Sequence, residues 1–145
     1  MKTIEIDKKI DAFLFENQIP LEIVIDEFLC KELICGLLLI RECLDDVLHL
    51  KFSNFSFFLK LGTGSGSTTT LISLKDEVFK GLISMNNLEY ALYYLLKYYR
   101  DGIGEADHID IDIDFIGLDK QEVTITLTVN NYKDYTSKQA REMLG

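Results

Sequence analysis

The sequence predicts a single α+β domain spanning residues 1–145, in which helices pack on one side of a largely antiparallel sheet. Three patterns support this fold class. In residues 55–61, 109–115 and 123–129, apolar side chains alternate with polar ones, as they do in half-buried strands. In residues 88–99, apolar side chains recur at spacings of three and four, which indicates an amphipathic helix.

The N-terminal part leaves several alternatives open. Residues 3–17 predict a short strand or lead-in followed by a helix, and Pro20 marks a boundary. Residues 21–29 fit a strand or a helix; we prefer the helix because it accounts for more of the apolar positions. Residues 34–40 fit either a buried strand or the start of a helix that continues through Leu48.

The middle of the chain predicts a hairpin before the helix. The strand at 55–61 is followed by the glycine-rich stretch 62–67 and by a second apolar run at 70–74, which we expect to pair with it. Residues 78–85 form a weaker apolar segment that predicts either a strand or a helical turn. At the far end of the chain, Thr136 has the spacing of a capping box and predicts a short terminal helix.

The amphipathic helix has clear end signals. Asn86 or Asn87 is a suitable N-cap, and Gly102 is a suitable C-cap after a basic last turn. We expect its buried stripe to comprise Leu88, Ala91, Leu92, Leu95, Leu96 and Tyr99. Helical spacing then places three further tyrosines along one flank of the helix, at the boundary with water: Tyr90, Tyr94 and Tyr98.

The acidic hairpin at 109–129 is the strongest signal in the sequence. If Phe115 lies opposite Val123, every apolar side chain pairs with an apolar one and every Asp faces a Thr. We expect the Asp side chains to share one solvated face of this hairpin; a purely structural alternative is that they form the solvated face of a hairpin at the edge of the sheet, where charge discourages aggregation. Asp is a poor strand former, so three of them in register indicate a functional surface.

Charge distribution limits the classes of partner. The net charge is -9, and residues 101–122 hold eight acids and one base, whereas the rest of the chain is nearly neutral. This field repels nucleic acid and anionic membranes and attracts basic proteins. No apolar run approaches the ~20 residues of a membrane span, and the acidic N-terminal start lacks a signal peptide, which predicts a cytoplasmic protein.

Sequence motifs predict neither a catalytic residue nor a cofactor. The stretch 62–67 lacks the Lys of a phosphate-binding loop. The Asp run lacks the Gly and Glu of a calcium loop, and His108 with Asp110 makes at most a weak metal site. The three cysteines have no zinc-binding spacing, and we expect buried reduced thiols: Cys30, Cys35 and Cys43.

An aromatic strip beside an acidic face is typical of protein interfaces. The predicted partner-binding residues are Asp110, Asp112, Asp114, Tyr90, Tyr94 and Tyr98.

The succession of a tyrosine-rich helix, Gly102, the strand 108–114 and a threonine-rich return strand resembles small cytosolic immunity proteins of polymorphic-toxin and contact-dependent growth inhibition systems. The resemblance implies a non-enzymatic module that binds and neutralises a basic toxin domain, for example a nuclease. One alternative is an acidic adaptor similar to dimeric type III secretion chaperones, with an apolar surface at residues 21–48. Another is a metal-dependent enzyme that uses His108. Monomer and dimer both remain open.

Overall fold

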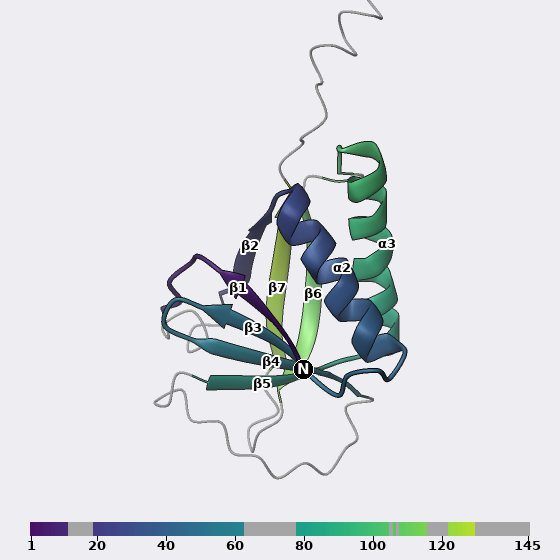
Figure 1. The fold of residues 1–145 in the computed structure, drawn as a ribbon. Helices are drawn as coiled ribbons and strands as arrows, with labels where there is room; N and C mark the ends of the chain where they lie inside the picture. Colours follow the sequence, from purple (N-terminus) through teal and green to yellow (C-terminus); the bar gives the residue numbers. More distant parts are fainter. Residues whose placement is uncertain (12–18, 63–77, 105, 107, 116–121, 130–145) are drawn as a thin grey trace, which may run out of the picture.

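The computed structural model describes residues 1–11, 19–62, 78–104, 106, 108–115 and 122–129. The described strands are β1 (Lys2–Ile6), β2 (Leu21–Ile25), β3 (Leu48–Phe52), β4 (Ser56–Leu61), β5 (Val78–Ile83), β6 (His108–Phe115) and β7 (Glu122–Val129). They form one seven-stranded sheet in the order β1-β3-β4-β5-β6-β7-β2. The helices α2 (Glu27–Arg41) and α3 (Met85–Asp101) lie on the same side of this sheet (Figure 1).

The α+β class is confirmed, but the sheet is mixed and the prediction of a largely antiparallel sheet is wrong. β1 and β3, β4 and β5, and β2 and β7 pair in parallel, whereas β3 and β4, β5 and β6, and β6 and β7 pair antiparallel. Alternation of apolar residues reveals a strand but not the direction of its neighbour. Direction depends on the connections, and each parallel pair here is joined by a connection much longer than a hairpin loop.

The sheet has two parts that meet where β5 pairs with β6. Among the described residues, this pairing joins Gly81 to Phe115 and Leu82 to Asp114. In Figure 1, β1, β3, β4 and β5 run across the molecule while β6, β7 and β2 run along it. We refer to these groups as the four-strand part and the three-strand part. Lys8, just after β1, donates a hydrogen bond from its ammonium group to the carbonyl oxygen of Glu22 on β2, which links the two outer edges of the sheet.

The core lies between the sheet and both helices. Apolar side chains from every strand, such as Ile111 of β6, meet the inner faces of α2 and α3. The helices contribute residues such as Leu37 of α2 and Leu95 of α3. A cavity of about 30 Å³ remains between them and is lined only by apolar side chains. A space of this size can hold one water, but without polar partners it stays dry.

The N-terminal alternatives resolve into a strand and then a helix. The preferred helix over residues 21–29 is wrong for β2, where alternate side chains are buried as β2 pairs in parallel with β7. The helix begins after Asp26, whose carboxylate accepts a hydrogen bond from the Leu29 N–H at 2.7 Å. Residues 34–40 are helical, but α2 ends at Arg41 and Leu48 instead begins β3. The helix expected within residues 3–17 falls largely outside the described residues.

The strands of the middle region are partly confirmed. β4 matches the predicted strand, and the strand alternative holds for β5. The described neighbours of β4 are β3 and β5. The proposed partner at 70–74 and the terminal helix from Thr136 lie outside the described residues. β3 was not predicted: its first residue, Leu48, stood at the end of the helix alternative, and no element was predicted for its other four residues.

Helix α3 is confirmed, with its start moved by two or three residues. Ser84 is the N-cap, and its hydroxyl accepts a hydrogen bond from the Asn87 N–H at 3.2 Å. Gly102 is the C-cap, as predicted, with a left-handed φ of 73° that favours glycine. Its N–H donates to the Tyr98 carbonyl at 2.7 Å.

Candidate protein-binding site

The acidic hairpin is present as β6 and β7, with its register displaced by two residues from the predicted one. Val123 lies opposite Ile113 instead of Phe115. A displacement of two keeps every side chain on its face, because the period of a strand is two. Asp112 therefore still faces a Thr, but Asp114 lies opposite Glu122.

The hairpin lies inside the sheet, so the alternative of an edge hairpin is wrong. β5 pairs with one end of β6, and β2 covers the outer side of β7. Ile109 and Ile111 are buried on the helix side of the sheet. The alternate residues Asp110 and Asp112 are exposed on the opposite side. The side chain of Asp114 is outside the described residues.

Cross-strand hydrogen bonds orient the two described carboxylates. Thr126 donates from its hydroxyl to Asp110 Oδ1 at 2.6 Å, and Thr124 donates to Asp112 Oδ1 at 2.8 Å. Each bond leaves the other carboxylate oxygen available to a partner. It also offsets part of the poor strand propensity of Asp, since cross-strand pairs stabilise sheets. The aspartates thus have a structural role in addition to any role in binding.

Glu22 extends this surface and was missed by the sequence analysis. It is exposed on β2 and lies beside Thr126, whose other neighbour is Asp110, so an acid, a threonine and an acid form one row across three strands. The strand alternative for residues 21–25 would have placed Glu22 on the polar face of a strand. Because we preferred the helix, this position was not predicted. We call Glu22, Asp110 and Asp112 the acidic face.

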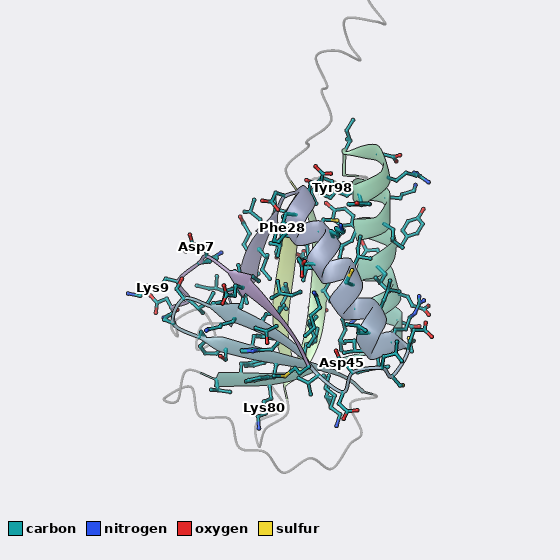
Figure 2. The ribbon with its side chains drawn as sticks, in the orientation of Figure 1. Asp7, Lys9, Phe28, Asp45, Lys80 and Tyr98 are labelled. Carbon is teal, nitrogen blue, oxygen red and sulfur yellow. The ribbon has the colours of Figure 1, made fainter. Side chains whose placement is uncertain are left out.

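The same side of the four-strand part carries the opposite charge. Lys51, Lys60 and Lys80 occupy outward positions of β3, β4 and β5, with Glu5 beside Lys51. Figure 2 shows Lys80 pointing away from the helices. The open side of the sheet therefore divides into an acidic and a basic half.

His49 sits in the basic half and forms a small polar cluster. Its ring stacks on Phe58 with centroids 4.4 Å apart, and its nitrogens lie 3.0 Å from Ser56 Oγ and 3.3 Å from Thr3 Oγ1. Partial burial and the charge of Lys51 lower the pKa of His49. A histidine beside a serine resembles a base and nucleophile, but Thr3 supplies no carboxylate to stabilise an imidazolium. This geometry supports a structural role.

The tyrosine part of the predicted site is largely wrong. Tyr94 and Tyr98 are 2% and 0% exposed, whereas Tyr90 is 50% exposed. The hydroxyl of Tyr94 donates to the Ala106 carbonyl at 2.8 Å. The hydroxyl of Tyr98, which is labelled in Figure 2, donates to the Ile25 carbonyl at 3.3 Å. Buried tyrosines with bonded hydroxyls are core residues and cannot anchor a partner.

The buried stripe of α3 is rotated accordingly. Leu96 and Tyr99, predicted as core, are 48% and 39% exposed. The inner face must pack against both α2 and β6, and the rotated stripe places Tyr94 and Tyr98 there instead. The apolar pattern alone did not separate these two orientations, because Tyr fits both a core and a boundary position.

The cysteines differ in environment. Cys30 is buried, donates from Sγ to the Leu95 carbonyl at 3.2 Å, and has a pKa raised to about 12 by burial and by the charge of Asp26. Cys35 and Cys43 are exposed, so the prediction of buried thiols is correct only for Cys30. Within the described ranges, no group of three or more His, Cys, Asp or Glu side chains could hold a metal ion.

The apolar surface proposed at residues 21–48 belongs mostly to the core, with exposed exceptions such as Phe28 and Leu44. Phe28, labelled in Figure 2, is 72% exposed. It borders an open pocket with Lys31 and Tyr99. Among the residues with described positions, no helix has the length and hydrophobicity to cross a membrane. Comparison with protein-family models, curated proteins and solved structures finds no match to this chain.

Proposed function

We propose that the chain is a non-enzymatic module whose acidic face binds a basic protein. The observation that carries this proposal is the pair of outward carboxylates on Asp110 and Asp112, each bonded to a threonine, with Glu22 in the same row as Asp110. Carboxylates that are oriented before binding lose less conformational entropy when a partner arrives. They also attract Lys and Arg side chains and speed association.

The partner that fits best is a basic toxin domain, in particular a nuclease, as the resemblance to cytoplasmic immunity proteins implies. A nuclease attracts phosphates with a positive cleft, and a row of carboxylates can occupy that cleft. No Lys or Arg occupies the described outward positions of β2, β6 and β7, and the Lys8 ammonium group bonds the backbone of Glu22, so the charges of Asp110 and Asp112 are not neutralised by these strands. Asp114 remains part of the proposed site on its sequence position alone.

The test measures binding of the basic toxin domain encoded beside the gene for this chain by titration calorimetry. We expect Asp110→Asn/Asp112→Asn/Asp114→Asn to weaken binding at least about a hundredfold, because paired interfacial charges contribute several kcal/mol. Asn keeps an oxygen that can accept the threonine hydrogen bonds, so the variant is expected to fold.

The matched control is Glu27→Gln/Glu42→Gln/Asp46→Asn, which removes the same charge from exposed positions at the ends of α2 and just beyond it. It should bind within about threefold of the native chain, as expected for charges outside the contact. Equal losses of affinity in both triple variants would mean that net charge alone explains the effect. An unchanged affinity of the aspartate variant would exclude the acidic face as the binding site.

A further inference from the structure

The outer side of α3 is unusually apolar. Ten large apolar side chains are exposed among the described residues, and five of them belong to α3. These five are Met85, Tyr90, Tyr93, Leu96 and Tyr99. Single exposed apolar residues are ordinary on a protein surface, but a concentration rich in tyrosine on one helix is typical of an interface.

Seven solvent-facing positions of α3 lie symmetrically about Tyr93, the middle residue of the helix, whereas the exposed Met85, Tyr99 and Asp101 fall outside this set. The seven positions follow spacings of three and four in both directions from Tyr93, which is the pattern of a helix that packs against another helix. These positions, which we call the α3 stripe, are Asn86, Glu89, Tyr90, Tyr93, Leu96, Lys97 and Arg100.

We propose that the α3 stripe binds a second copy of this chain in an antiparallel, two-fold symmetric dimer centred on Tyr93. In such a dimer, a residue that lies a given number of positions before Tyr93 in one copy faces the residue that lies the same number of positions after Tyr93 in the other copy. Glu89 then faces Lys97 of the second copy, and the reciprocal pair forms at the other end. In the same way Tyr90 meets Leu96, and Tyr93 meets its own equivalent.

Charge complementarity favours this occupant. The stripe places an acid four residues before Tyr93 and a base four residues after it, so an antiparallel copy brings unlike charges together twice. Lys97 already lies toward the centre, with Nζ 5.2 Å from the centroid of the Tyr93 ring. A parallel copy would instead place Glu89 beside Glu89 and Lys97 beside Lys97, which is unfavourable.

The distribution of net charge favours the same approach. The chain carries -9 overall, which repels a second copy, but the stripe holds Glu89, Lys97 and Arg100, and the exposed Asp101 pairs with Arg100 at 2.8 Å, so the outer side of α3 is close to neutral. The acidic face lies on the side of the sheet away from α3. Two copies can therefore meet along α3 with little repulsion, and both acidic faces stay open to a partner. The dimer does not depend on the proposed function.

Disulfide crosslinking tests the geometry directly. In a Cys35→Ser/Cys43→Ser background, which retains the buried Cys30, we expect Tyr93→Cys to form a covalent dimer on mild oxidation. Tyr90→Cys alone and Leu96→Cys alone should not do so, because each is three residues from the centre and its equivalent is about 9 Å away along the helix. A mixture of the two variants should crosslink. Equal crosslinking of every single variant, or none with Tyr93→Cys, would overturn the proposal.

Charge reversal tests the pairing by an independent measurement. Sedimentation of the full chain should give a dimer dissociation constant that rises at least about tenfold for Glu89→Lys or for Lys97→Glu, and that returns toward the native value when both are combined. Circular dichroism of each variant checks that α3 still folds. A chain that is monomeric at every concentration, or a double variant as weak as the singles, would refute the dimer.

Discussion

The β6–β7 hairpin and helix α3 were both predicted from apolar periodicity, but only the hairpin kept its predicted faces. Its register moved by two residues, and Asp110 and Asp112 remained outside because two is the period of a strand. In α3, a rotation of the stripe exchanged Tyr94 and Tyr98 with Leu96 and Tyr99. The faces predicted for an alternating strand therefore survive an error in register. The buried face predicted for a helix with amphipathic residues on several sides is less secure.

The sharpest way to test this comparison is to truncate an inner and an outer tyrosine of α3. Tyr98→Ala should lower the free energy of unfolding by about 3–5 kcal/mol, because it removes a fully buried ring from the core. Tyr93→Ala should cost less than about 1 kcal/mol in the monomer, since that ring is 53% exposed. Urea denaturation at low protein concentration measures both. Similar losses would mean that the inner and outer sides of α3 are assigned incorrectly.

The contact between α2 and α3 can be tested through the pH dependence of stability. Because the pKa of Cys30 is about 12 in the folded chain against an ordinary value of 9.0, the neutral thiol favours folding. This contribution is complete below pH 9 and is lost as the pH rises toward about 12, by roughly 1 kcal/mol per pH unit. Denaturation of the native chain and of Cys30→Ala across this range isolates the difference. Parallel pH profiles would contradict the burial of Cys30.

The smallest expected effect concerns the hairpin. Thr126→Val removes the hydroxyl that donates to Asp110 but keeps the shape of the side chain and a good strand former. We expect a loss of about 0.5–1 kcal/mol in the free energy of unfolding. Thr128→Val, on the same strand opposite His108, is the control and should change stability less. Thermal denaturation compares the two variants. A larger loss of stability in the control would mean that the hydrogen bond from Thr126 to Asp110 contributes little to stability.

Much of the fold could be predicted from local patterns. Alternation identified β4, β6 and β7, and the end signals of α3 identified its C-cap. The strand alternative for β2 was set aside, because a short apolar segment beside a helix fits either structure, and the five-residue β3 was not predicted at all. Nothing local indicates that β2 pairs with β7, since strand partners distant in the chain leave no signature in either segment.

The candidate site was half predictable for the same reason. Asp110 and Asp112 came from a regular alternation within one strand, and the structure places both outward. Glu22 depends on the pairing of β2 with β7, and its contribution to the row needed the three-dimensional structure. The environments of the tyrosines depended on which side of α3 meets its neighbours, which the helix sequence does not specify alone.

The pairing of β2 with β7 also affects how the chain folds during synthesis. Leu21 pairs with Ile125, so β2 must wait for more than a hundred further residues before its partner leaves the ribosome. Contacts that close such long loops form late, and the waiting strand is exposed to misassociation. The four-strand part, whose last strand ends at Ile83, can assemble first. The row that joins Glu22 to Asp110 is therefore completed among the final steps of folding, after most of the polypeptide has been made.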